Sequence, residues 1–194
     1  MRGNFRWHGT RAALLFTLGL LVVMSGTAYG QGWTDDMESY TLGTGPAAQD
    51  TLGQWTTWDA DAAADGEIVA DPDAGGAQGQ CVLAGNVKDI VALINGADDG
   101  AWSIKVKYYL PGASTGSVFF LLETLYSNGG DKEQGYGITM DMTAGTADDG
   151  QGGTFTLVRD AWAELQLDVD LGTNLMVVSY NGTVINPAAQ LSNN

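Results

Sequence analysis

Strict alternation of apolar and polar residues is the feature that most limits what this chain can fold into. In residues 101–110 every second residue is apolar, beginning with Trp102. In residues 164–171 every second residue is apolar, beginning with Leu165. Because successive side chains of a strand point to opposite faces of its sheet, both segments are predicted to be antiparallel strands with one buried face.

Turn sequences separate these and other strand-like runs. Asn181-Gly182 predicts a two-residue hairpin, since both residue types tolerate positive φ. Weaker strand patterns cover Trp33–Glu38, Glu67–Ala70, Gln80–Leu83, Asp89–Ile94, Tyr136–Met142, Thr154–Val158 and Leu175–Tyr180. No amphipathic stretch long enough for a substantial helix follows residue 31. The sequence therefore predicts an all-β fold, an antiparallel two-sheet β-sandwich or jelly roll.

In the segment Val118–Tyr126, apolar residues occupy both odd and even positions, so both faces of a strand would be apolar. This predicts a central strand covered on both sides. The alternating segments assign further residues to the core. The predicted core residues are Trp102, Ile104, Val106, Val118, Phe120, Leu122, Leu165, Leu167 and Val169.

The first thirty residues have the organisation of a secretory signal peptide. Arg2, Arg6 and Arg11 form a basic head, Ala12–Met24 is a short apolar run, and Ala28-Tyr29-Gly30 supplies the small residues of a cleavage site. An uncleaved membrane anchor is the alternative, although a spanning helix needs about 20 apolar residues. We therefore expect a signal peptide at 1–30, one domain at 31–194, and a secreted or periplasmic (cell-envelope) location, with membrane contact only through the signal.

The composition after residue 30 excludes several functions. Five basic residues face 23 acidic ones, a net charge of −18, which disfavours nucleic acid and anionic lipid as partners. The single histidine, His8, lies in the predicted signal, so Ser-His-Asp catalysis and the usual zinc sites are excluded. Cys81 is the only cysteine, so an intramolecular disulfide is impossible, and its apolar neighbours predict a core position.

Three short motifs stand out: Asp35–Gly43 (DDMESYTLG), Trp55–Asp61 (WTTWDAD), and Ala161–Leu171 followed by Tyr180-Asn181-Gly182. They resemble motifs of exported bacterial domains with a concanavalin A-like lectin/glucanase (LamG-like jelly-roll) fold. The resemblance implies that fold, and many such domains bind carbohydrate while some are catalytic. Such domains usually continue past the last hairpin, whereas this chain stops at Asn194. We therefore expect the closing strand to be missing, which would leave an unpaired edge at Trp33–Tyr40 and a marginally stable or self-associating domain.

A polar sheet face is the first candidate site, because lectins and glucanases of this fold hold sugars on a sheet or its rim. Polar side chains would bond the hydroxyls and aromatic rings would pack on the sugar faces. The candidate ligand-binding residues are Trp55, Trp58, Lys105, Lys107, Tyr109, Glu123, Glu164, Gln166 and Asp168, with Asp141 on the same face and Trp162 and Tyr180 as further rings. The alternative is an ordinary solvated sheet face.

Of the acidic residues in the chain, Glu164 and Asp168 most resemble the paired catalytic carboxylates of the glucanases that have this fold. Gln166 stands where a middle acid is expected, and four residues of strand span about 13 Å. Retaining glycosidases need about 5–5.5 Å between their carboxyl groups. We therefore expect no catalytic residues and no hydrolysis of β-glucans.

Asp59, Asp61 and Asp65 are the candidate ligands of a structural Ca²⁺, the only cofactor considered. An EF-hand is excluded, because Ala63, Ala64 and Ala70 occupy three of its required positions. A solvated acidic loop is the alternative.

The sequence thus favours an exported, non-catalytic module that binds carbohydrate or a cell surface, with polysaccharide or a cell-surface glycan as its partner. A glycoside hydrolase of the laminarinase type and a structural or adhesive envelope protein without a small ligand are the alternatives.

Overall fold

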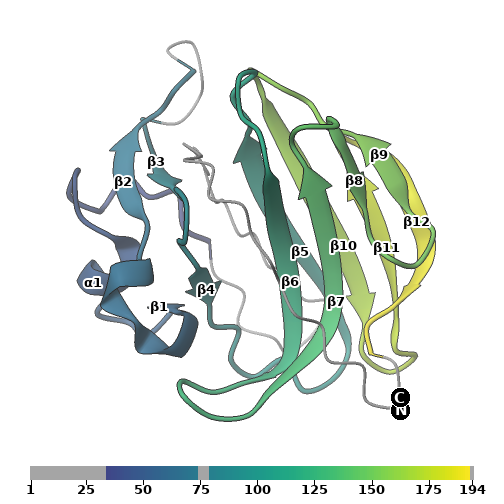
Figure 1. The fold of residues 1–194 in the computed structure, drawn as a ribbon. Coiled ribbons are helices and arrows are strands. Elements are labelled where there is room, and N and C mark those ends of the chain that lie inside the picture. The colour runs from purple at the N-terminus through teal and green to yellow at the C-terminus, as the bar shows by residue number, and fades with distance from the viewer. Residues whose placement is uncertain (1–33, 74–78, 193–194) are drawn as a thin grey trace.

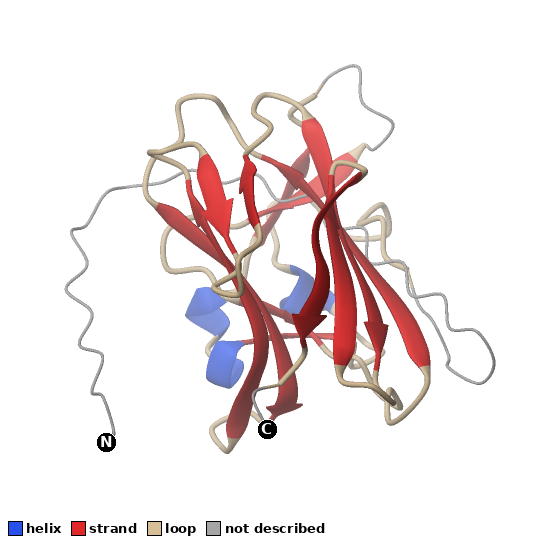
Figure 2. Cartoon of the chain, turned by 90° about the vertical axis from the view of Figure 1, so that its right-hand side faces the viewer, coloured by secondary structure: helices blue, strands red, loops and turns tan. Residues whose placement is uncertain are grey.

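The computed structural model describes residues 34–73 and 79–192 as an all-β chain built around two four-stranded antiparallel sheets. The predicted signal peptide and Trp33 lie outside the described residues. The sheets form two layers of a sandwich (Figure 1; Figure 2). Helix is limited there to α1 (Pro46–Gln49) and two short 3-10 turns, η1 (Trp58–Ala60) and η2 (Ala62–Ala64). The predicted two-sheet β-sandwich with little helix is confirmed.

The first sheet, here called sheet I, has the strand order β12-β11-β10-β5. Its strands are β5 (Ala101–Tyr109), β10 (Trp162–Asp170), β11 (Leu175–Tyr180) and β12 (Thr183–Gln190). The predicted hairpin at Asn181-Gly182 joins β11 to β12, and both turn residues have positive φ, 46° and 77°. Strand β12 was not predicted. It contains Pro187, which an edge strand tolerates beside the register shift between β11 and β12.

The second sheet, sheet II, has the order β6-β7-β8-β9. Its strands are β6 (Ser117–Tyr126), β7 (Lys132–Asp141), β8 (Thr146–Asp148) and β9 (Thr154–Thr156). The prediction that Val118–Tyr126 is a central strand is wrong, because among residues 34–73 and 79–192 the strand β6 has β7 as its one partner and lies at the end of the strand order of sheet II. Phe119, Leu121 and Leu125 on its outer face remain 42–49% exposed.

The core lies between the inner faces of the two sheets. Sheet I contributes Trp102, Ile104, Val106, Leu165, Leu167 and Val169, all buried as predicted, with Met176, Val178 and Tyr180 from β11. Sheet II contributes Tyr136, Ile138 and Met140. The predicted core residues Val118, Phe120 and Leu122 are only partly buried, but they pack against this cluster.

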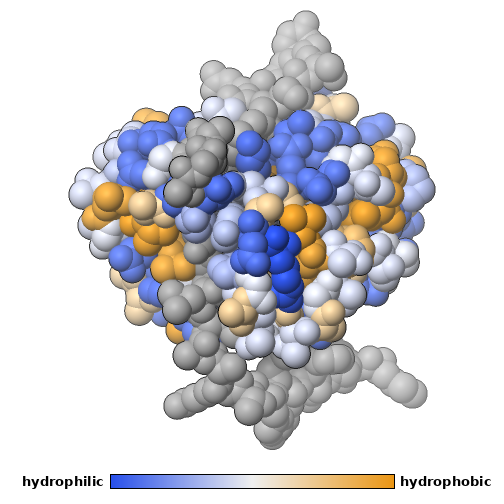
Figure 3. All heavy atoms as spheres, turned by 90° about the horizontal axis from the view of Figure 1, so that it is seen from above, coloured by the Kyte–Doolittle hydropathy of each residue, from blue (hydrophilic) through white to orange (hydrophobic). Residues whose placement is uncertain are grey.

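Two small antiparallel pairs precede the sandwich in the chain. Strand β1 (Trp55–Thr57) pairs with β4 (Ile90–Ala92), and β2 (Glu67–Ala70) pairs with β3 (Gln80–Leu83). Both pairs lie beside the sandwich, on the side where β5 and β6 form the sheet edges (Figure 1). Seen from above, the surface mixes polar residues with separate apolar patches (Figure 3).

The predicted strand at Trp33–Glu38 is wrong in its described part, residues 34–38. The Asp35 carboxylate accepts hydrogen bonds from the Met37 N–H at 2.9 Å, the Tyr40 hydroxyl at 2.8 Å and the Trp55 indole at 2.8 Å. Met37 has φ of 66° and is 1% exposed. These contacts form a turn, so the expected unpaired strand edge at Trp33–Tyr40 is not found in the described residues.

A buried carboxylate joins the β8–β9 loop to both sheets. Asp149 is 5% exposed and accepts hydrogen bonds from the Tyr136 hydroxyl at 2.9 Å and the Asn186 amide at 2.7 Å. The N–H groups of Gln151 and Gly153 donate to its other oxygen. Burial raises the pKa of Asp149, but the hydrogen bond from Asn186 and the other three outweigh it, so the pKa lies below its usual value.

Candidate functional site

The register of β5 and β10 places most of the candidate residues on the outer face of sheet I. Tyr109 lies opposite Trp162, Lys107 opposite Glu164, and Lys105 opposite Gln166. Asp168 follows two positions along β10. Side chains at these positions share a face because their neighbours Val106, Leu165 and Leu167 point into the core. We call this set, together with Ser103 opposite Asp168, the sheet I face.

Polar contacts organise this face. The Lys105 ammonium lies 3.4 Å from the Glu164 carboxylate, and Gln166 Nε2 donates to both carboxylate oxygens of Asp168 at 2.9 Å. The side chains of Lys105 and Glu164 are each about one third exposed, so this ion pair contributes little to stability. Because the two side chains are partly exposed, the Lys105 ammonium can still donate to a ligand and the Glu164 carboxylate can still accept from one.

An aromatic pair closes one end of the sheet I face. The rings of Tyr109 and Trp162 meet edge to face with centroids 5.6 Å apart. The Trp162 indole also donates to Asp71 at 3.1 Å, which fixes the ring against the end of β2. Tyr109 is half-buried, so part of its ring remains available for contact.

Glu164 and Asp168 are spaced more widely along β10 than the paired carboxyl groups of glycosidases. They occupy the first and last of five consecutive positions on a regular strand, with Gln166 between them. That spacing corresponds to about 13 Å along the strand, beyond the roughly 5–9.5 Å that glycosidase carboxyl pairs use.

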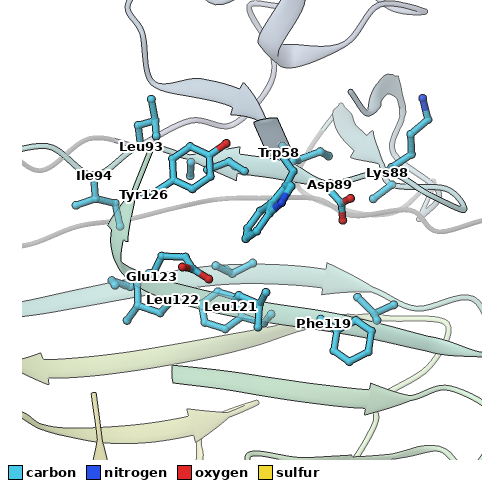
Figure 4. A pocket seen from close by; sticks show the side chains of 18 of the residues that line it. Trp58, Lys88, Asp89, Leu93, Ile94, Phe119, Leu121, Leu122, Glu123 and Tyr126 are labelled. Atoms are coloured by element: carbon cyan, nitrogen blue, oxygen red, sulfur yellow. The ribbon is translucent and has the colours of Figure 1, made fainter. Parts of the chain in front are cut away.

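Trp58 and Glu123 lie apart from the sheet I face, in a groove between β4 and β6. The groove has a volume of about 450 Å³, within the range of roughly 300–1,000 Å³ typical of ligand pockets. Asp89–Asn95 forms one wall and Val118–Thr124 the other. Trp58 projects from the first side toward the strand that carries Leu121 and Glu123 (Figure 4).

A cluster of aromatic and charged residues closes one end of this groove, here called the β4–β6 groove. The rings of Trp58 and Tyr126 are 5.7 Å apart, and the Lys132 ammonium lies 4.9 Å from the centre of the Trp58 ring. Lys132 also pairs with Asp59. The Tyr126 hydroxyl donates to the Thr57 carbonyl at 2.9 Å, which ties the end of β6 to β1.

Two carboxyl groups of the groove have raised pKa values. Burial raises the pKa of Glu123, and the Lys132 charge opposes this only in part. Asp89 is exposed as a whole residue, but its carboxyl group is partly shielded from water. This loss of solvation raises the pKa of Asp89. Perturbed carboxyl groups in a concave apolar site are typical of binding sites.

The three candidate calcium ligands have different partners. Asp59 pairs with Lys132 and accepts from the Gly129 N–H at 3.0 Å, and these contacts lower its pKa. Asp61 accepts from the Ala63 N–H at 2.9 Å, and Asp65 accepts from the Ala48 N–H at 3.0 Å. Within residues 34–73 and 79–192, no cluster of three or more ligating side chains that could hold a metal is found. A calcium site at these aspartates thus gains no support.

Other candidate residues lie elsewhere. Trp55 is 4% exposed and Tyr180 is 4% exposed, so both rings are core residues and cannot stack on a ligand. Asp141 ends β7 in sheet II, where its carboxylate accepts from the Thr143 and Ala144 N–H groups. The sheet I face thus excludes Trp55, Tyr180, Glu123 and Asp141.

Sequence reasoning missed Asp89, Tyr126 and Lys132. Asn128-Gly129-Gly130 marks the turn that brings Lys132 back beside Tyr126, so the hairpin pattern could have indicated this pair. Nothing in the local sequence indicated that Asp89 would face β6, because that contact joins segments about thirty residues apart in the chain.

Over the described part of the chain, no helix is long and apolar enough to cross a membrane. No protein-family model, curated protein or solved structure matches the chain.

Proposed function

We propose that this protein is an exported, non-catalytic binding module for a neutral carbohydrate, such as a polysaccharide or a cell-surface glycan. The proposed ligand surface is the sheet I face. We also propose that its sandwich is a jelly roll of the concanavalin A-like kind, on the resemblance of its motifs.

The charge balance of the sheet I face carries this proposal. The chain after residue 30 has five basic residues against 23 acidic ones, yet two of the five lie on this face. Lys107 is opposite Glu164, and the Lys105 ammonium lies 3.4 Å from the Glu164 carboxylate. The two lysines offset the charges of Glu164 and Asp168, and Asp170 at the end of β10 adds one further negative charge, so this face is less acidic than the molecule as a whole. A neutral ligand rich in hydroxyl groups can accept from the ammonium and amide groups and donate to the carboxylates.

Tyr109 adds the second element of carbohydrate recognition. Its half-buried ring lies at the end of the row of polar side chains and is held by Trp162. Aromatic rings pack against the apolar faces of pyranose sugars, while the neighbouring polar groups set orientation.

A glycan array probed with residues 31–194 tests the proposal. We expect binding to at least one neutral glycan, no release of reducing sugar, and about tenfold weaker binding, ~1.4 kcal/mol, for Tyr109→Ala and Gln166→Ala. Tyr109→Phe should retain most of the affinity. Thr139→Ala, an exposed position on β7 in sheet II, is the control and should bind normally.

Three outcomes contradict the proposal. Binding that survives the sheet I variants would place the ligand elsewhere. Hydrolysis of laminarin that disappears in Glu164→Gln would identify a glycoside hydrolase. Absence of any bound glycan would favour a structural or adhesive role.

A further inference from the structure

We propose that the β4–β6 groove binds a small molecule with an apolar body and one protonated amine, with the body held between the sheets and the amine at Glu123. This site is separate from the sheet I face and does not depend on the function proposed for that face.

The groove reaches the interior of the sandwich. Ile104, Val106 and Tyr108 line it, although they belong to the inner face of β5 and are only 6%, 3% and 4% exposed. Phe120 and Leu122 of β6, which pack against the core, line it from the second sheet. The cavity of about 450 Å³ therefore extends from the surface to the space between the sheets. An apolar ligand body placed there gains hydrophobic and van der Waals contacts.

A carboxylate oxygen without a donor marks the polar end of the groove. Oε2 of Glu123 is buried and has no hydrogen-bond partner among the described residues. The side chains of Glu123 and Trp58 project toward one another from opposite walls (Figure 4). A buried carboxylate oxygen that lacks a donor is destabilising. An ammonium group would supply both the missing hydrogen bond and the opposite charge.

The charges around the groove favour a cation over an anion. Asp89 supplies a second carboxyl group at the opposite wall. Lys88 also lines the groove, but its ammonium group donates to a backbone carbonyl at 2.9 Å. Lys132 pairs with Asp59, and its charge opposes the raised pKa of Glu123 only in part. These two ammonium groups are engaged with the protein, so an anionic ligand would meet two carboxyl groups instead.

Three probes with the same eight-carbon chain test this selection by isothermal titration calorimetry of the purified protein at pH 7. Octylamine is protonated at this pH, as a lysine side chain is, octanol is neutral, and octanoate is an anion. We expect octylamine to bind at least about tenfold more tightly than octanol, and octanoate to bind more weakly than either.

Protein variants test the two carboxyl groups. Glu123→Gln should weaken octylamine about fivefold or more and leave octanol within about twofold, because the variant keeps the shape of the side chain and removes its charge. Asp89→Asn should weaken octylamine selectively as well, by about twofold or more. Glu67→Gln is the matched control, because it removes the same charge from an exposed position on β2, and it should bind all three probes normally.

Methyl groups locate the apolar body. With ¹³C-labelled methyl groups, octylamine should shift the signals of Ile104 and Val106, which are buried and line the groove. The methyl groups of Val184 should not shift. Val184 is 53% exposed on β12, at the opposite end of the strand order of sheet I from β5.

Several results would overturn the proposal. No binding of octylamine at about 1 mM, the weak end of measured affinities, excludes this class of ligand. Equal binding of octanol and octylamine, or tighter binding of octanoate, excludes selection of a cation. Binding that leaves the Ile104 and Val106 methyl signals unchanged places the ligand elsewhere. If Glu123→Gln fails to fold, the probe series and Asp89→Asn still decide between these outcomes.

Discussion

At the scale of single residues, the two faces of each alternating strand have different roles. On β10, Leu165 and Leu167 are fully buried, while Gln166 and Asp168 lie on the sheet I face. A change at an odd position therefore tests the core, and a change at an even position tests the surface proposed to bind ligand.

Leu167→Ala should reduce the free energy of unfolding by about 2–5 kcal/mol, because it removes a fully buried side chain and leaves a cavity. Urea denaturation followed by circular dichroism measures this. Asp168→Asn at the exposed neighbouring position should change stability by less than about 0.5 kcal/mol. A loss below that limit for Leu167→Ala would show that the inner face has been misassigned.

Asp149 should make stability depend on pH at acid values. Its folded-state pKa is lower than that of the unfolded chain, so its contribution is complete above the unfolded value of about 3.9 and is lost as pH falls through the folded value. Asp149→Asn should therefore be less stable than wild type at pH 7, and the gap in urea midpoints should narrow at lower pH. A constant gap would contradict the assigned hydrogen bonds.

At the scale of elements, strands were predicted correctly from the sequence where one face is buried and the other is exposed to solvent. Strands β5, β10 and β11 were predicted closely, because alternation reports that environment directly. Strand β6 was placed wrongly at the centre of its sheet. Apolar residues at both odd and even positions occur in a strand covered on both sides, but they also occur in an edge strand beside a groove, so the pattern alone does not separate the two.

Three other strands were missed for different reasons. Strands β1 and β8 have only three residues each, too few to show a period. Strand β12 contains Asn186 and Pro187, which interrupt the pattern, yet Asn186 is buried and donates to Asp149. The sheet I face could be predicted because its residues follow two regular strands, whereas the groove depends on contacts between distant segments.

The β11–β12 hairpin should depend on the left-handed conformation of its turn. Gly182 has φ of 77°, and a Cβ there would meet no atom within 4 Å, so the cost of Gly182→Ala is conformational strain alone. We expect a loss of about 1–2 kcal/mol in unfolding free energy. Asn181→Gly is the matched control, because glycine keeps the required φ, and it should stay within about 0.5 kcal/mol of wild type. Equal stabilities for both variants would contradict the turn assignment.

At the scale of the whole molecule, net charge opposes compactness. A charge of −18 after residue 30 creates repulsion that is relieved when the chain expands, while added salt screens it. The melting temperature should therefore rise as NaCl increases from about 0.01 M to about 1 M, where the Debye length falls from about 30 Å to about 3 Å. A melting temperature that falls with added NaCl would mean that favourable ion pairs outweigh the repulsion.

The central claim is that the sheet I face of this sandwich binds a neutral glycan without cleaving it. The most direct measurement is a titration of ¹⁵N-labelled residues 31–194 with the best glycan from the array, followed by amide chemical shifts. We predict that the shifted amides cluster on β5 and β10 around Lys105, Tyr109 and Gln166, and that the glycan remains intact. Shifts concentrated in the β4–β6 groove, or cleavage of the glycan during the titration, would contradict the claim.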